Sequence, residues 1–312
     1  MPPQAVSKEE IMRTAAIAMT RERVDTTRPV VLRNAAAADA PQAGRILFDA
    51  FAAIAGQHRF PADFPSAAAG ISLVEQLIAH PSIFSVVAET GGRVAGSNFL
   101  WQLDSIAGIG PITVDPALQN EALGRALMRA VLEQADRNGF AGTRLVQAAY
   151  HNRSLALYSK LGFDAREPLS VMNGKFAGER SPQRPVRPAA VADLQACSRL
   201  AAGVLGHDRQ NELRDAIGRG QAMVVEEGGR ITGYTTGIGF FGHSVGATNE
   251  DLQALIAAAP RIDGPGVLVP TRNAALLRWC LAHGLRIVQP MTLMSRGVYD
   301  EPAGAFLPSI LY

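Results

Sequence analysis

An eleven-residue pattern occurs twice in this chain, and the repeat limits the folds that the chain can adopt. "GFDAREPLSVM" begins at Gly162, and "GLRIVQPMTLM" begins at Gly284. Two further segments recur in the same order: "LRNAAAADA" is matched by "VRPAAVADL", and "VVAETGGRVAG" is matched by "VVEEGGRITG". Three matches in one order indicate two copies of one domain.

Each copy has the same predicted layout. A strand ending in Arg33 or Arg187 precedes an N-capping Asp, Asp39 or Asp193, and a helix. Two strands around a Gly-Gly turn follow, so the chain is of the α/β class. We predict an N-terminal extension over 1–27, a first domain over 28–173, a Gly-, Pro- and charge-rich linker over 174–184, and a second domain over 185–312. The extension is predicted as a short helix or a disordered leader.

Composition excludes several classes of protein. With 47% apolar residues, 19% charged residues and a net charge of +2, the chain is expected to be a soluble globular protein without a basic nucleic-acid-binding face. No run of about 18 apolar residues occurs, and the N-terminus does not resemble a signal peptide. Cys197 and Cys280 stand alone, which indicates no metal site, no disulfide and a cytoplasmic location.

The first copy carries a segment that the second copy lacks. Leu123, Ala126, Leu127, Ala130 and Val131 recur at helical spacing. Small residues lie before and within the first turn of this helix, where a ligand can approach the backbone closely. Since the first N–H groups of a helix have no partners within it, the helix start favours a phosphate.

Two motifs resemble the GNAT superfamily of N-acetyltransferases. Val114-x-Pro116-x-x-Gln119-x-x-Ala122-x-Gly124-x-Ala126 is similar to the family's acetyl-CoA pyrophosphate loop, with Ala122 where the family usually has Gly. In "HNRSLALYSKLGF", Asn152, which also suits a helix N-cap, Tyr158 and Gly162-Phe163 match the second motif of the family. The resemblance covers about residues 28–172. It implies two tandem GNAT-like domains, each a central, mostly antiparallel sheet flanked by helices.

The resemblance implies roles for individual residues. The strand end Ile112–Val114, together with Asn152, would bind the pantetheine arm of acetyl-CoA. The loop Gln119–Ala126 would bind its pyrophosphate, and Tyr158 would protonate the leaving thiolate. Asp104 lies where family members often keep an acidic residue, and is a candidate base with a solvated turn carboxylate as the alternative. Glu89 and His151 are further candidate bases, but a solvated strand end explains Glu89 as well, and a packing or surface role explains His151. The implied cofactor residues are Ile112, Thr113, Val114, Gln119, Asn120, Glu121, Ala122, Leu123, Gly124, Arg125, Ala126 and Asn152.

Substrate contacts are expected from an insert in the first copy. His58, Phe60, Asp63 and Phe64 either line an acceptor pocket or pack as an ordinary loop. In one tandem group of the family the terminal carboxylate enters the active site, so the apolar tail suggests the same for Tyr312.

The second copy has no such loop, and Glu250 and Asp251 would repel a pyrophosphate at its helix start. This half is therefore predicted to be structural or substrate-shaping. The expected activity is direct acetyl transfer from acetyl-CoA to a small-molecule or peptide amine, with a non-catalytic acetyl-CoA sensor or scaffold as the alternative. The acceptor amine and the acyl-chain preference are open, and so is homodimer formation.

Overall fold

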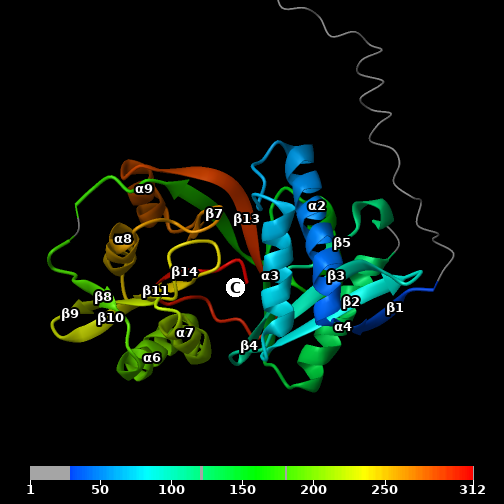
Figure 1. Cartoon of the computed structure of the whole chain (residues 1–312). Helices are drawn as coiled ribbons and strands as arrows, with labels where there is room; N and C mark the ends of the chain where they lie inside the picture. Colours follow the sequence, from blue (N-terminus) through cyan, green and yellow to red (C-terminus); the bar gives the residue numbers. More distant parts are fainter. Residues whose placement is uncertain (1–28, 120–121, 180, 312) are drawn as a thin grey trace, which may run out of the picture.

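The computed structural model describes residues 29–119, 122–179 and 181–311 (Figure 1). The predicted extension over 1–27 lies outside these residues, as do Asn120, Glu121 and Tyr312.

The two copies contain the same succession of elements. The first copy consists of β1 (Val31–Asn34), η1 (Ala37–Asp39), α2 (Ala40–His58), α3 (Ala67–Ala79), β2 (Ile83–Thr90), β3 (Arg93–Trp101), β4 (Ile106–Ile109), β5 (Thr113–Val114), η2 (Pro116–Leu118), α4 (Leu123–Arg137), β6 (Gly142–Ala148), α5 (Asn152–Lys160) and β7 (Asp164–Gly174). The second consists of β8 (Val186–Pro188), η3 (Val191–Asp193), α6 (Leu194–Leu205), α7 (Gln210–Gly218), β9 (Met223–Glu227), β10 (Arg230–Thr235), β11 (Ser244–Gly246), α8 (Asn249–Ala258), β12 (Val267–Pro270), α9 (Ala274–Ala282) and β13 (Leu285–Gly297), followed by β14 (Ala305–Leu307). The order of strands and helices confirms the predicted repeat.

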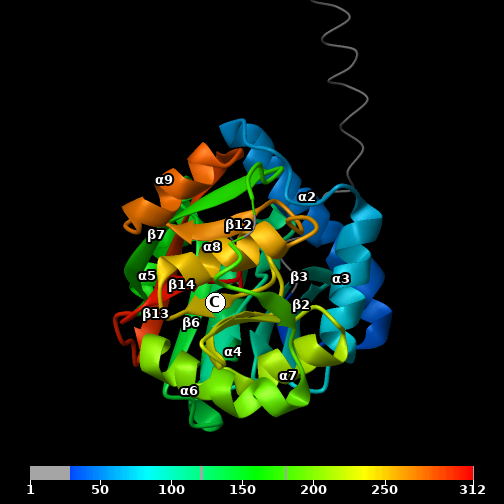
Figure 2. The same cartoon turned by 90° about the vertical axis from the view of Figure 1, so that its left-hand side faces the viewer.

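Within the described residues the strands form two sheets. In Figure 1 the larger sheet extends from β1 on the right to β7 on the left, and the smaller sheet lies in the left half; Figure 2 shows the same arrangement from the side. The larger sheet has the order β1-β2-β3-β4-β6-β13-β7-β12, with β5 paired to β3, and the smaller has the order β14-β11-β10-β9-β8. The pairing is antiparallel throughout both ladders except between β4 and β6. These sheets, flanked by helices, confirm the predicted α/β fold.

The two repeated eleven-residue segments pair with each other. They form β7 and β13, and Leu169 lies opposite Met291, which holds the same position in the second copy. β13 is inserted between β6 and β7 of the first copy, and β7 is inserted between β13 and β12 of the second. The copies therefore exchange their last strands about an approximate two-fold axis. The sequence did not predict this exchange, and it joins the two predicted domains in one sheet across their boundary; the division of roles between the domains stays a prediction.

A second repeated feature is an ion pair at the start of each copy. Arg33 donates to Asp39 (2.7 Å) and Glu89 (2.8 Å), and Arg187 contacts Asp193 (2.7 Å) in the same way. The guanidinium of Arg33 holds the pKa of Asp39 below its usual value. Asp39 and Asp193 occupy the N-cap positions of α2 and α6, as predicted. Neither carboxylate bonds to its own helix; each accepts a backbone N–H that precedes the helix.

Helices cover both faces of the first copy's strands. α2 and α3 pack over one face, around buried residues that include Leu47, Leu77 and Phe99. α4 covers the other face with its predicted stripe, of which Leu123, Leu127 and Val131 are buried. Because β2 and β3 are covered on both sides, nearly all of their residues are buried. This packing fixes the position of α4 relative to β5.

Candidate active site

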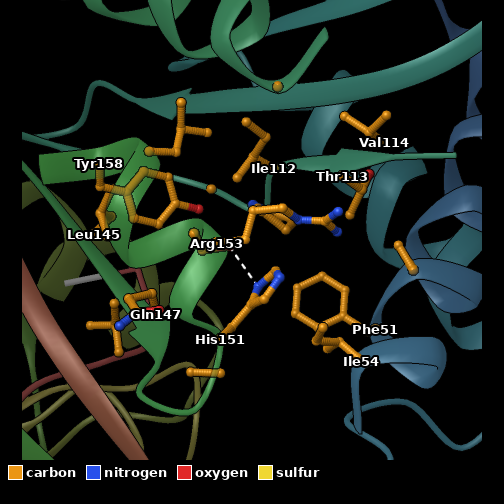
Figure 3. Close-up of a pocket in the computed structure, with 18 of the residues that line it drawn as sticks. Phe51, Ile54, Ile112, Thr113, Val114, Leu145, Gln147, His151, Arg153 and Tyr158 are labelled. Atoms are coloured by element: carbon orange, nitrogen blue, oxygen red, sulfur yellow. Dashed lines mark hydrogen bonds between the residues drawn. The ribbon is translucent and has the colours of Figure 1, made fainter. Parts of the chain in front are cut away.

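A cavity of about 490 Å³ lies at the N-terminal end of α4, between β5 and β6 (Figure 3). Side chains of α2 and α5 form two further walls. The second copy and the tail complete the lining with Phe240, Phe241, Gln289, Met291, Ile310 and Leu311. Both copies therefore shape this cavity, and most of its lining is apolar.

The cavity opens where two strands of the sheet separate. β4 pairs with β6 over Ile106–Gly108, opposite Gly142–Arg144, and this ladder ends there. The chain then continues into β5, which pairs with Ser97 and Gly96 of β3. Ile112, Thr113 and Val114 therefore face Leu145 and Gln147 of β6 across the cavity. The peptide groups on this side of β5 are available to an extended ligand.

The start of α4 is built to receive an anion. Ala122 occupies its N-cap in the left-handed conformation (φ 60°), without a side-chain cap, and the first turn holds no acidic residue. Gly124 lines the cavity, and a Cβ there would make ordinary van der Waals contacts with Leu157 (3.6 Å) and Val114 (3.9 Å). Arg125 and Arg153 also line this end, and Arg153 donates to Gln119. The unpaired N–H groups, the helix dipole and two guanidinium groups favour a phosphate here.

The N-terminus of α8, the corresponding helix of the second copy, is capped by a carboxylate. Asp251 accepts the backbone N–H of Thr248 (2.9 Å) and a hydrogen bond from the Thr232 hydroxyl (2.7 Å). Glu250 and Asp251 both lie in the first turn of α8, as the sequence indicated. A carboxylate of the protein thus occupies the position at the start of α8 that corresponds to the uncapped start of α4.

Tyr158 lies on α5 with its hydroxyl directed into the cavity (Figure 3). The side chain is buried, and Phe163 packs edge-on against its ring. Burial raises the pKa of Tyr158 to about 12, although a hydrogen bond with Ser154 acts in the opposite direction. The phenol is therefore protonated at neutral pH and can donate a hydrogen bond or a proton.

Two buried polar side chains also line the cavity: Gln147, which the sequence did not single out, and His151. Gln147 is 5% exposed, and neither polar atom of its side chain has a hydrogen-bond partner within the described part of the chain. The same is true of Nε2 of His151, whose Nδ1 lies 2.6 Å from the Ser154 hydroxyl. Buried polar atoms without partners are rare in folded proteins, and a ligand in the cavity could satisfy these.

The four predicted substrate residues divide into two pairs. Asp63 and Phe64 line the cavity, whereas His58 and Phe60 lie outside its lining and pack against Tyr150. Gln289 of β13 donates to Asp63 (3.2 Å). Burial raises the pKa of Asp63. This end of the cavity thus offers one carboxyl group in largely apolar surroundings.

Two other predicted residues lie elsewhere. Asp104 is absent from the cavity lining: its carboxylate accepts the backbone N–H groups of Asn211 (3.0 Å) and Glu212 (3.3 Å) at the start of α7. The structure therefore gives Asp104 a capping role, and its role as a base stays a prediction. The prediction that Asn152 caps α5 is wrong, because His151 holds the N-cap. Asn152 is exposed and lies outside the lining, so its contact with a cofactor stays a prediction.

The remaining cofactor-binding predictions fall into three groups. Those that line the cavity are Ile112, Thr113, Val114, Gln119, Ala122, Leu123, Gly124 and Arg125. Ala126 lies one residue further along α4 and donates its N–H to the Ala122 carbonyl oxygen (3.0 Å). Asn120 and Glu121 lie outside the described residues.

No cluster of three or more His, Cys, Asp or Glu side chains able to hold a metal occurs among residues 29–119, 122–179 and 181–311. In the same ranges, none of the helices combines the length and apolarity of a membrane span. Both cysteines are free and buried.

Comparison with known proteins agrees with this architecture. Residues 49–163 match the model of the acetyltransferase (GNAT) family. An IAA acetyltransferase of Azospirillum brasilense is 30% identical over 96 residues; the match covers 30% of this chain and 62% of the relative. The chain thus spans less than two thirds of the length of this curated relative.

Solved structures extend the likeness to both copies. A GCN5-related N-acetyltransferase from Sphaerobacter thermophilus matches with a TM-score of 0.59 at 17% identity, covering 87% of this chain and 96% of that one. A protein of Pyrococcus horikoshii described as an acetyltransferase matches with a TM-score of 0.67 at 18% identity, covering 91% and 92% of the two chains. A tandem GNAT protein from the clavulanic acid biosynthesis pathway matches with a TM-score of 0.52 at 15% identity and covers 87% of this chain and all of that one (100%). Residues 49–163 are thus similar to the acetyltransferase (GNAT) family, and the chain as a whole has the same fold as the tandem GNAT protein.

Proposed function

We propose that the protein transfers an acetyl group from acetyl-CoA directly to a primary amine, in the cavity of the first copy. The observation that carries this proposal is the convergence of three features on one cavity: the separated strands, the uncapped start of α4 and the Tyr158 hydroxyl. Each feature answers one requirement of the reaction.

The donor fits the cavity by the chemistry of its parts. The pyrophosphate would lie at the N-terminus of α4, near Arg125 and Arg153. The pantetheine arm would lie between β5 and β6 and bind the backbone of Ile112–Val114 as an additional strand does. In this arrangement the thioester reaches the part of the cavity that contains Tyr158.

Acetyl transfer requires a neutral amine, a polarised carbonyl and a stabilised leaving group. A free alkylamine has a pKa near 10.4, so it must lose a proton before it attacks. Backbone N–H groups of the open strand would stabilise the oxyanion. The Tyr158 phenol, whose pKa is raised to about 12, keeps its proton until it can donate to the departing sulfur.

The acceptor end supports an amine with an apolar body. Asp63 and Phe64 would contact the acceptor, and His58 and Phe60 would support the wall through Tyr150. A buried carboxyl beside aromatic side chains favours a group that can become cationic. We place the protein in the cytoplasm on the basis of its cysteine usage.

Calorimetric titration with acetyl-CoA tests the donor site. We expect one site per chain, which is lost in Gly124→Glu because the added carboxylate would enter the anion site. The matched control is Gly203→Glu: Gly203 lies within α6, and a Cβ there would meet nothing within 4 Å. Two sites would contradict the closed state of α8, and no binding would refute the proposal.

A second assay separates the enzyme from a sensor that only binds acetyl-CoA. Thiol release from acetyl-CoA is followed with a panel of primary amines that differ in apolar bulk. We expect at least one amine to accelerate release, and Tyr158→Phe to reduce the maximal rate by about 10²-fold or more. If acetyl-CoA binds at one site but no amine accelerates thiol release, the result would favour the sensor. The degenerate second copy of the repeat is the observation that supports this alternative.

A further inference from the structure

A primary carboxamide is buried in the wall of the cavity. Gln147 of β6 is 5% exposed and lines the cavity, and neither its Oε1 nor its Nε2 has a hydrogen-bond partner within residues 29–119, 122–179 and 181–311. A carboxamide both donates and accepts hydrogen bonds. Because an unpaired polar group in an apolar wall is unfavourable, Gln147 is suited to a ligand that brings an acceptor and a donor to this place.

The alternation of side chains along β6 places Gln147 on the face of the sheet that α4 and α5 cover. Leu145, the preceding residue on this face, packs in the same core as Tyr158. Val146 and Ala148 lie on the opposite face and pack against a core that includes residues of the second copy. Gln147 therefore shares the face of Tyr158 and lies apart from the wall that the second copy contributes.

Gln147 also lies along the same wall of the cavity as Tyr158. Figure 3 shows Leu145, Gln147 and Tyr158 together on this wall, and all three line the cavity. In the proposed complex the pantetheine arm lies between β5 and β6, and the thioester reaches Tyr158. The thioester would then have the backbone of Ile112–Val114 on one side and the carboxamide of Gln147 on the other.

We propose that Gln147 binds the thioester of acetyl-CoA and is a catalytic residue of the acetyl transfer. Its Nε2 donates a hydrogen bond to the carbonyl oxygen. Its Oε1 accepts one from the amide N–H of the pantetheine arm that a short ethylene link separates from the sulfur. Both polar atoms then have partners. The proposal rests on the proposed acetyl transfer and adds a side-chain donor from β6 to the backbone donors of β5.

The hydrogen bond from Nε2 strengthens during the reaction. The amine nitrogen forms a bond to the acetyl carbon, and the π electron pair of the carbonyl moves to oxygen. When this pair returns, the carbon–sulfur bond breaks with its electrons on sulfur. The sulfur takes a proton from Tyr158, and the nitrogen releases one to water, from which Tyr158 is reprotonated. Since a hydrogen bond to a charged oxygen is stronger than one to a neutral carbonyl, Gln147 favours the transition state over the bound thioester.

The carbonyl stretch of bound acetyl-CoA tests this contact without an acceptor. A hydrogen bond lowers the frequency of this stretch, and isotope-edited infrared spectra of the full chain with acetyl-CoA labelled with ¹³C at the carbonyl isolate its band. We expect the band to move to higher frequency in Gln147→Met, whose side chain is of similar length and has no donor. Gln147→Leu repeats the test with a second side chain. A band at the same frequency in the unmodified protein and both variants would overturn the proposal.

Thr143→Val is the matched control. Thr143 lies on the same face of β6, is 2% exposed and has no hydrogen-bond partner for Oγ1 in the part of the chain that the structure describes, but it does not line the cavity. We expect this variant to leave the band unchanged. Thr143→Val and Gln147→Met should both keep the Tm of the unmodified protein, because each replaces a buried polar group without a partner by an apolar one.

Ligand binding and kinetics separate this role from a contact with the acceptor. The unmodified protein should bind acetyl-CoA about tenfold more tightly than S-ethyl-CoA, in which a methylene replaces the carbonyl, and Gln147→Met should lose most of this preference. With the amine that gives the fastest thiol release, Gln147→Met should lower kcat by about 10²-fold, the usual effect of removing one oxyanion donor. A higher KM for the amine at an unchanged kcat would assign Gln147 to the acceptor and overturn the proposal.

The two proposals fail in different ways. If the unmodified protein does not bind acetyl-CoA, the proposed acetyl transfer fails and the role of Gln147 fails with it. If acetyl-CoA binds at one site and an amine accelerates thiol release, but Gln147→Met changes neither the carbonyl band nor kcat, only the role of Gln147 is refuted.

Discussion

Substitution of Ala122 tests the backbone conformation of the loop that precedes α4. Its φ of 60° lies in the left-handed region, which Ala occupies at a cost of about 1–2 kcal/mol. Replacement by Gly removes that cost but adds about 0.5–1 kcal/mol of backbone entropy that is lost on folding. The difference predicts that Ala122→Gly stabilises the protein by about 0.5 kcal/mol.

The matched control is Ala126→Gly, four residues further along α4. Ala126 lies inside the helix, where the same substitution removes about 1 kcal/mol of stability. The two variants should therefore differ by about 1.5 kcal/mol. In differential scanning calorimetry we expect Tm to rise by about 1 °C in the first variant and to fall by about 3 °C in the second. If Ala122→Gly lowers Tm as much as Ala126→Gly does, Ala122 is not in the left-handed conformation, and the argument for a preformed loop fails.

Three further predictions concern the binding site, the capping of α7 and pH. Gly124→Ala should leave Tm unchanged, because the new Cβ meets only ordinary contacts, but raise the Kd of acetyl-CoA about tenfold in calorimetry, since it narrows the cavity beside Val114. Asp104→Ala should lower the stability by about 1 kcal/mol in thermal unfolding without changing kcat, whereas a loss of turnover at unchanged stability would restore Asp104 as a base. Burial, with Arg144 and Arg209, lowers the pKa of His207 to about 3, so the unfolded chain binds more protons than the folded chain between pH 3 and 6.5. Stability is therefore lost as pH falls through this range, and His207→Gln should reduce the drop in Tm between pH 7.5 and 5; an unchanged drop would contradict this assignment.

The sequence predicted the features that depend on local pattern. The repeat, the strands around the Gly-Gly turns and the stripe of α4 all follow from periodicity and turn residues, and the structure confirms them. The loop at Ala122 could be recognised because small residues before a helix allow a ligand to approach the backbone closely. The closed start of α8 was found for the same reason, from two acidic residues in its first turn.

Features that depend on contacts between distant residues were missed. Asp104 was considered as a base because its strand ends near the site, but its hydrogen-bond partners are Asn211 and Glu212, more than a hundred positions away. His151 was set aside as a lone histidine. The signal that could have drawn attention to it is the spacing of His151, Ser154 and Tyr158, which places three proton-bearing groups on one helical face.

The sequence did not predict the strand exchange. The exchange explains what the second copy contributes to the cavity. β7 and β13 carry the same pattern, so each can add to either copy's sheet, and the pairing of Leu169 with Met291 makes the exchanged arrangement symmetric. Once β13 lies beside β6, its residues Gln289 and Met291 line the cavity of the first copy. The second copy can therefore lose its own anion site and still be needed, because its last strand completes the sheet and forms a wall of the remaining site. Substitutions on β13 are then expected to alter the acceptor end of the proposed site, whose donor end would lie in the first copy.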